Sequence, residues 1–138
     1  MSKEKIVMCF GTFDVLHLGH INYFKQAKLK GFQLVVVVAR DKNIPLNKKV
    51  RHCEEDRLRL IQELKIVDFA ILGDEKDKMN PIIKFNPELI CLGYDQEIDT
   101  YFLQKELIKL GLKTKIKRLE PYNENFHKSS LIKRFCKK

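Results

Sequence analysis

Five short runs of consecutive apolar residues recur along the chain. They are Ile6–Phe10, Leu34–Ala39, Phe69–Leu72, Leu89–Leu92 and the weaker Thr114–Leu119. Alternation of apolar and polar residues marks a strand with one face in water, whereas unbroken apolar runs are typical of parallel strands covered on both faces. The pattern therefore predicts five buried strands.

The stretches between these runs have the composition and length of helices. They are Gly19–Lys30, Glu54–Leu64, Pro81–Phe85, Thr100–Leu110 and Ser129–Cys136. Gly31 and Gly111 stand where the first and fourth of these helices should end, as capping glycines do. Pro81 and Pro87, each after an Asn, are typical of helix starts and breaks.

Strict alternation of strands and helices predicts an α/β fold with one Rossmann-like, doubly wound, five-stranded parallel sheet and helices on both faces. Such sheets bind their ligands beyond the carboxyl ends of the strands. The chain shows no internal repeat and no linker, so residues 1–138 are expected to form a single domain.

Neither the apolar runs nor the cysteines indicate a membrane or a secreted protein. The longest apolar run, Leu34–Ala39, has six residues, far fewer than the roughly 18 that span a bilayer. The four cysteines, at positions 9, 53, 91 and 136, form no C-x-x-C pair. We therefore expect a reduced, cytoplasmic protein with no membrane partner.

Positive charge is concentrated at the C-terminal end. Residues 113–138 carry nine Lys and Arg against two Glu, within a net charge of +9 for the whole chain. A basic segment attracts polyanions, so a non-catalytic nucleotide- or RNA-binding protein is one hypothesis. Tyr122, Phe126 and Phe135 do not interleave with the charges as base-stacking residues do, and no nucleic-acid partner is expected.

The segment from Gly11 to His20 carries the candidate chemistry. It follows the first predicted strand and reads Gly-Thr-Phe-Asp-Val-Leu-His-Leu-Gly-His. His17 and His20 are three residues apart and share a face if both lie in a first helical turn. A helix N-terminus adds N–H groups and partial positive charge, and Gly19 leaves space for a phosphate. These features predict a phosphate cradle; neither a P-loop nor a G-x-G-x-x-G motif occurs.

The same segment resembles the signature of the cytidylyltransferase-like nucleotidyltransferases, with Gly-Thr-Phe-Asp-x-x-His-x-Gly-His at positions 11–20. Within that superfamily the chain is most similar to the archaeal FAD synthases. The supporting segments are Val38–Asp41, Ile71–Gly73, Leu92–Gln96 and Lys128–Ile132.

The resemblance implies the transfer of AMP from ATP to the phosphate of FMN, which gives FAD and pyrophosphate. It also implies a divalent metal, Mg²⁺, bound through the nucleotide phosphates and not by a metal site of the protein. Cytidylyl transfer from CTP to glycerol 3-phosphate or a similar small phosphate is the alternative within the same chemistry. A homodimer is a further expectation from the resemblance.

The resemblance also implies roles for individual residues. His17 and His20 would donate hydrogen bonds to the reacting phosphate. The further nucleotide-binding residues that it implies are Thr12, Phe13, Leu18, Gly19, Asp95, Arg118, Ser129 and Ser130. The Phe13 ring has an alternative place in the core, Asp95 an alternative role in a turn, and the serines an alternative role as helix caps.

A basic loop between the second strand and the second helix is expected to reach the phosphates. Lys48 and Lys49 are both candidates, with Lys49 taken as the catalytic one, and a solvated loop is the alternative. Arg57 occupies a place where an arginine commonly recurs in this family. Asp14 is expected either to orient its loop by accepting backbone N–H bonds, which we favour, or to contact the acceptor.

Overall fold

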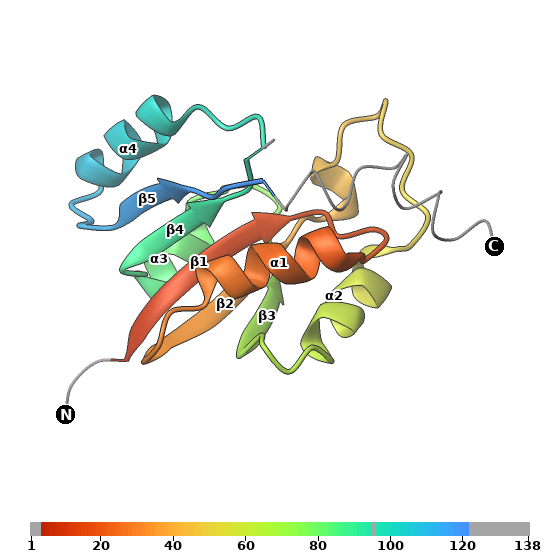
Figure 1. The fold of residues 1–138 in the computed structure, drawn as a ribbon. Coiled ribbons are helices and arrows are strands. Elements are labelled where there is room, and N and C mark those ends of the chain that lie inside the picture. Colours follow the sequence, from red (N-terminus) through yellow and green to blue (C-terminus); the bar gives the residue numbers. More distant parts are fainter. Residues whose placement is uncertain (1–3, 95, 122–138) are drawn as a thin grey trace.

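The computed structural model describes residues 4–94 and 96–121 (Figure 1). One parallel sheet is formed by β1 (Lys5–Gly11), β2 (Phe32–Val38), β3 (Phe69–Leu72), β4 (Leu89–Leu92) and β5 (Lys115–Arg118), in the order β3-β2-β1-β4-β5. The helices are α1 (Leu18–Ala27), the 3-10 turn η1 (Asp41–Asn43), α2 (Glu54–Gln62), α3 (Asn80–Phe85) and α4 (Thr100–Lys109). All five strand predictions are confirmed.

The helices cover both faces of the sheet (Figure 1). Phe24 of α1 and Ile61 of α2 belong to the core on one face, and Ile82 of α3 and Leu107 of α4 belong to the core on the other. Strand β2 supplies both cores in alternation, with Val36 on the first and Val37 on the second. This explains the unbroken apolar run and confirms the doubly wound fold.

The strand order reverses direction between β1 and β4. From β1 the chain winds outward to β2 and β3, then crosses back to place β4 on the other side of β1, with Cys9 opposite Cys91. The loops that follow β1 and β4 therefore leave the sheet on different sides. The gap between such loops is where doubly wound sheets bind ligands.

The predicted end of α1 is wrong, whereas the predicted end of α4 is confirmed. Helix α1 ends at Ala27 and not at Lys30, because Lys28 is already extended; Gly31, with φ of 83°, belongs to the turn that follows. Gly111, with φ of 75°, does end α4, and the N–H of Leu112 donates to Leu107 O at 2.9 Å. This bond is typical of a capping glycine. The helix expected at 129–136 lies outside the described residues.

No helix within residues 4–94 and 96–121 combines the length and the apolar composition that crossing a membrane requires. The three cysteines of these ranges, Cys9, Cys53 and Cys91, are free thiols. Burial raises the pKa of Cys91 to about 11. That thiol is therefore protonated at neutral pH and packs as a small apolar side chain.

Candidate active site

The chain leaves β1 through a strained turn at Phe13. This residue has φ of 55°, in the left-handed region that side chains other than glycine rarely adopt. The turn folds the buried Phe13 ring back against Gly11, where a Cβ atom would lie only 2.5 Å from Phe13 Cζ. Glycine is therefore required at position 11, and the Phe13 ring belongs to the core.

His17 and His20 together form a capping box at the start of α1. His17 is the N-cap residue, and its Nδ1 accepts a hydrogen bond from the N–H of Gly19 at 3.0 Å. His20 reaches back, and its Nδ1 accepts from the N–H of His17 at 3.2 Å. The structure thus brings the two rings together, with their centroids 4.0 Å apart.

These hydrogen bonds fix the proton position on both neutral rings. A ring nitrogen that accepts from a backbone N–H carries no proton, so each neutral imidazole carries its proton on Nε2. Two Nε2–H donors are therefore held beside the first-turn N–H groups of α1, which carry the partial positive charge of a helix start. The Phe13 ring meets His20 edge to face, with centroids 5.5 Å apart, and supports it from the core.

The sequence predicts that glycine at position 19 leaves space for a phosphate, whereas the structure gives another physical reason for a glycine there. A Cβ at this position would lie 2.7 Å from Cε1 and 2.9 Å from Nδ1 of His17. The space left by the glycine is therefore filled by the imidazole of the cap. Leu18, between His17 and Gly19, is 63% exposed and is the first residue of α1.

Asp14 ties this turn to the loop before α2. Its carboxylate accepts hydrogen bonds from the N–H groups of Arg51, at 2.9 and 3.0 Å, and of His52, at 2.9 Å. The bond from Arg51 is the main cause that holds the pKa of Asp14 below its usual value. These contacts are of the kind that a loop-orienting role requires; contact with an acceptor stays a prediction.

Arg57 joins the ends of the first two strands from inside the protein. Its side chain is buried, and Nη1 donates to Thr12 O at 2.9 Å and to Ala39 O at 2.8 Å. Nε donates to His52 O at 3.0 Å, and Nη2 pairs with Asp41 Oδ1 at 2.6 Å. Arg57 therefore organises the turn after β1 and the loop after β2 together.

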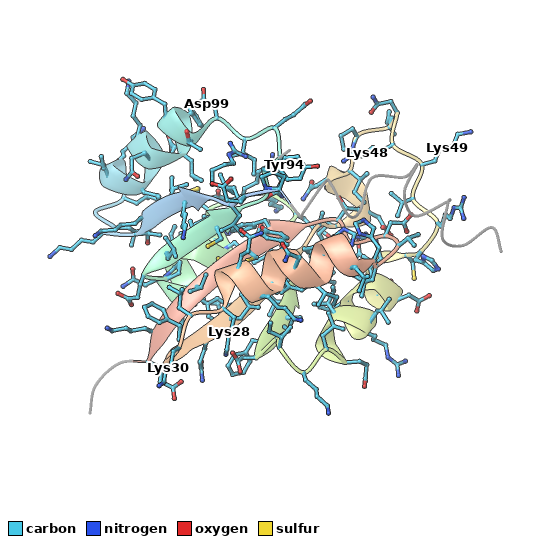
Figure 2. The ribbon with its side chains drawn as sticks, in the orientation of Figure 1. Lys28, Lys30, Lys48, Lys49, Tyr94 and Asp99 are labelled. Atoms are coloured by element: carbon cyan, nitrogen blue, oxygen red, sulfur yellow. The ribbon has the colours of Figure 1, made fainter. Side chains whose placement is uncertain are left out.

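Lys48 and Lys49 lie on the exposed loop after η1, at the end of the sheet where the strands end (Figure 2). Tyr94 lies at the same end, whereas Lys28 and Lys30 lie at the other (Figure 2). The base of this loop is the segment that Asp14 and Arg57 hold. The loop is therefore anchored to the turn that precedes the histidines, and the choice between the two lysines stays open.

Arg118 holds the loop after β4. Its Nη1 donates to Gly93 O at 2.9 Å and to Gln96 O at 2.7 Å, and its Nη2 donates to Ile98 O at 2.9 Å. Its predicted contact with the base or a phosphate stays a prediction. The residues Asp95, Ser129 and Ser130 lie outside the described ranges, so their predicted nucleotide contacts are also untested.

Gln96 and Tyr23, which were not among the predicted site residues, link the ends of β1 and β4. Gln96 Nε2 donates to Phe10 O at 2.9 Å, and its Oε1 accepts from the N–H of Gly93 at 2.6 Å. The Tyr23 hydroxyl donates to Cys91 O at 2.9 Å, and burial raises its pKa, so it stays protonated as a donor. Their sequence signal was weak, because a Gln after a strand and a Tyr within a helix are common.

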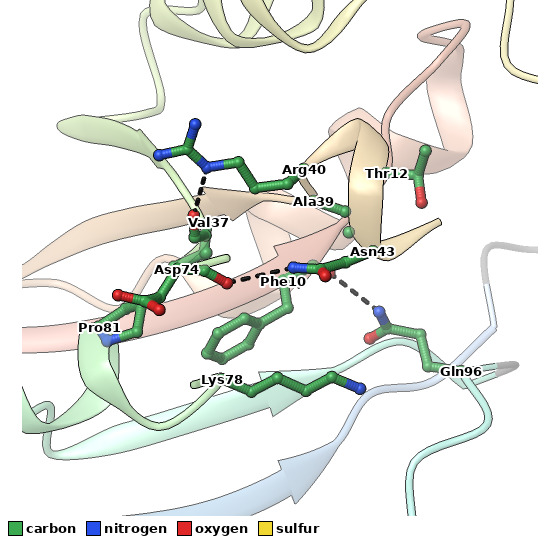
Figure 3. Close-up of a pocket in the computed structure, with 12 residues that line it drawn as sticks. Phe10, Thr12, Val37, Ala39, Arg40, Asn43, Asp74, Lys78, Pro81 and Gln96 are labelled. Carbon is green, nitrogen blue, oxygen red and sulfur yellow. Dashed lines mark hydrogen bonds between the residues drawn. The ribbon is translucent and has the colours of Figure 1, made fainter. Parts of the chain in front are cut away.

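A cavity of about 220 Å³ opens at the ends of β1, β2 and β3, beside α3 (Figure 3). The residues that line it include Phe10, Thr12, Arg40, Asn43, Lys78 and Gln96. Most of these follow a strand end, which is the place that the sheet topology predicts for a ligand site. Only Thr12 among them was a predicted site residue.

A family model described as cytidylyltransferase-like matches residues 8–135, which is most of the chain. The chain belongs to the cytidylyltransferase-like family. The family resemblance of the Gly11–His20 segment is thus confirmed, and the structure shows how the cytidylyltransferase-like signature is built. Its histidines cap a helix, and its glycines make room for two rings.

Archaeal proteins named FAD synthase are similar to this family member along nearly its whole length. That of Thermoplasma volcanium is 48% identical over 129 residues, which is 93% of this chain and 91% of that protein. That of Thermoplasma acidophilum is 44% identical over the same shares. That of Archaeoglobus profundus is 45% identical over 93% of this chain and 84% of its own.

Solved structures agree with the cytidylyltransferase-like fold. A Thermoplasma volcanium structure, described as a lipopolysaccharide core biosynthesis protein, is 50% identical with a TM-score of 0.82, over 86% of this chain and 98% of its own. A pantoate–beta-alanine ligase of Francisella tularensis has a TM-score of 0.64 at 14% identity, over 90% of this chain and 62% of its own. The second likeness shows the fold alone.

Residues 4–94 and 96–121 contain no group of three or more His, Cys, Asp or Glu side chains placed to bind a metal. Carboxylates near the strand ends have protein partners instead. Asp74 accepts from Asn80 Nδ2 at 2.9 Å and from the N–H groups of Lys76 and Asp77 at 2.8 and 2.9 Å. These bonds, led by that from Asn80, lower the pKa of Asp74 to about 2.

The Asp74 carboxyl is expected to make the free energy of unfolding depend on pH in the acid range. A carboxyl whose pKa falls on folding stabilises the protein fully above its unfolded pKa, here 3.8, and loses that effect as pH falls through its folded pKa. The unfolding free energies of wild type and Asp74→Asn should therefore converge between pH about 4 and about 2. Urea unfolding of both proteins at several pH values measures this; a gap independent of pH would contradict it.

Proposed function

We propose that this protein is an FMN adenylyltransferase that transfers AMP from ATP to the phosphate of FMN and releases pyrophosphate. The identity of 48% over 93% of the chain to a protein named FAD synthase carries the choice of substrates. The two Nε2–H donors at the start of α1 support the chemistry, because they form an anion site where a phosphoryl group can be held.

The reaction is an in-line displacement at the α-phosphorus of ATP. A phosphate oxygen of FMN forms the new P–O bond, and the bond to the oxygen that bridges the α- and β-phosphates breaks. Pyrophosphate leaves with that electron pair, and FAD is the other product. No covalent intermediate with the protein is needed, so positioning and charge stabilisation supply the catalysis.

His17 and His20 act on the charge that gathers on the α-phosphate oxygens. Their Nε2–H groups donate to those oxygens, while the capping box keeps both rings in the required tautomer. The donors are in place before the reaction, so they need no reorganisation as charge develops. The backbone of the turn at Thr12 and Phe13 holds the nucleotide beside them.

Lys48 or Lys49 would neutralise the leaving pyrophosphate when the loop lies over the site. Asp14 and Arg57 anchor the base of that loop from the motif turn and from the core. A divalent ion, Mg²⁺, fits as a group carried on the phosphates, because it keeps several waters and commonly binds proteins through substrate phosphates. When bound, it neutralises phosphate charge.

The deciding experiment offers the protein FMN and Mg²⁺ with ATP or CTP in separate reactions. Mass spectrometry of the flavin product should show FAD with ATP only, together with one pyrophosphate per FAD. Glycerol 3-phosphate in place of FMN is the matched acceptor control and should release no pyrophosphate. Pyrophosphate release from CTP and glycerol 3-phosphate, with no FAD from any mixture, would establish the cytidylyltransferase alternative.

Release of no pyrophosphate from any mixture, with tight nucleotide binding, would favour the non-catalytic binder. The substrates are small cytoplasmic metabolites, so we place the protein in the cytoplasm. The expected homodimer stays a prediction that the solution mass would test.

A further inference from the structure

The cavity beside α3 lies on the opposite side of the β1 end from the histidines. His17 and His20 start α1, and Phe13 beneath them belongs to the core under α1 and α2. Phe10 and Val37, which line the cavity, pack in the core under α3 and α4. The end of β1, at Gly11 and Thr12, separates the two places.

The geometry of in-line transfer explains why the two substrates would occupy places that are separated in this way. The attacking and leaving oxygens stand on opposite sides of the phosphorus. If the triphosphate lies at the start of α1, the acceptor phosphate approaches across the end of β1. The remainder of the acceptor then extends toward the cavity.

We infer that this cavity binds the flavin ring of FMN, with Phe10 packing on the ring and Lys78 paired with its electron-rich pyrimidine edge. The inference rests on the proposed function and assigns its acceptor site to residues for which the sequence predicted no role. The ribityl phosphate would run from the cavity toward Thr12.

The size of the cavity is consistent with a fused aromatic ring system. A cavity of 150 Å³ in another protein admits benzene, and this one measures about 220 Å³ and is open to solvent. Phe10, Val37 and Pro81 give it apolar walls. Flat aromatic ligands gain affinity by packing against such side chains.

Arg40 and Lys78 are the cationic residues that line the cavity, and Arg40 is paired with Glu54. Figure 3 shows the Lys78 side chain extending along the cavity near the Phe10 ring. It forms no ion pair with any residue of the described ranges. The turn that carries it is closed by Asp74, which accepts from the N–H groups of Lys76 and Asp77. Lys78 is therefore presented by an ordered turn and has its charge available for a ligand.

The test compares Lys78→Met, which keeps the unbranched apolar stem and removes the ammonium group, with Lys78→Arg. Lys76→Met is the matched control, because Lys76 belongs to the same turn and does not line the cavity. Quenching of flavin fluorescence gives Kd for FMN and for riboflavin, which has the same ring and no phosphate. In Lys78→Met both values should rise about 10-fold, the scale of a hydrogen bond to a charged group.

Lys78→Arg should recover most of this affinity, Lys76→Met should not change it, and KM for ATP should stay within about 2-fold of wild type in all three. Unchanged flavin binding in Lys78→Met, while the wild type makes FAD, would overturn the cavity assignment and leave the function standing. A rise in KM for ATP alone would assign the cavity to the nucleotide. Weaker binding of FMN but not of riboflavin would place Lys78 at the phosphate and overturn the ring placement.

Failure of the proposed function has a separate signature, because the wild type would then yield no product with the mass of FAD. That result would remove the flavin as occupant as well. The flavin-binding measurements do not depend on turnover, so the two failures are distinguishable.

Discussion

Replacement of His17 by alanine is expected to lower kcat for FAD formation about 10²–10³-fold, equal to about 2.7–4 kcal/mol of transition-state stabilisation. The His17 Nε2–H group is a donor fixed in place by the bond between Nδ1 and the N–H of Gly19. Such a donor acts on charge that develops during the reaction, so KM for ATP should change much less than kcat. His20→Ala should behave in the same way.

A second variant separates catalysis from helix capping. Asparagine is a good N-cap residue, so His17→Asn should keep the stability of α1 and still lose kcat. His17→Ala should in addition lose about 1 kcal/mol of stability with its cap. Single-turnover rates and urea unfolding of both variants measure the two effects. Wild-type kcat in His17→Asn would show that the imidazole is needed only as a cap, and the proposed mechanism would then be wrong.

The sheet was predictable because its signal is local. The run from Leu34 to Ala39 has no polar residue, and only a strand buried on both faces requires that. Both cores indeed take side chains from β2. The end of α1 was predicted less well, because Gly31 is also a strong signal for an ordinary turn, and the sequence does not show that Lys28 is already extended.

The histidine motif was predictable as a phosphate site, but its internal geometry was not. Spacing alone places His17 and His20 on one face; it does not show that each ring accepts a backbone N–H bond. Gly19 was assigned to phosphate approach, yet its missing Cβ makes room for the His17 ring. The sequence cannot distinguish these reasons, since both require the same residue.

The sequence pattern could not predict contacts between segments that are far apart along the chain. Arg57 was noted only by resemblance, and nothing in its neighbours indicates that the side chain is buried. Its acceptors, the carbonyls of Thr12, Ala39 and His52, come from three different segments. The cavity beside α3 has the same origin, because Lys78 and Phe10 meet only through the fold. Such sites follow from topology and side-chain reach, which local patterns do not encode.

Arg57→Met is expected to lower the free energy of unfolding by about 3 kcal/mol. The substitution keeps an apolar stem and removes every donor, so three backbone carbonyls near the buried guanidinium lose a partner. Two of these carbonyls, of Thr12 and Ala39, belong to partly buried residues, and a buried acceptor left unpaired costs about 1–3 kcal/mol. Since domains are stable by only about 5–15 kcal/mol, a large share of the total stability depends on this residue.

Arg57→Lys should recover only a small part of that loss, because a single ammonium group cannot reach acceptors that a planar fork contacts on several sides. Arg59→Met is the matched control: Arg59 lies on the same helix and is exposed, so its replacement should change stability by no more than about 0.5 kcal/mol. Urea unfolding followed by circular dichroism measures all three variants. If Arg57→Met unfolds at the wild-type midpoint, water replaces the guanidinium at these carbonyls. Arg57 would then not be what holds the turn after β1 against the loop of Lys48 and Lys49.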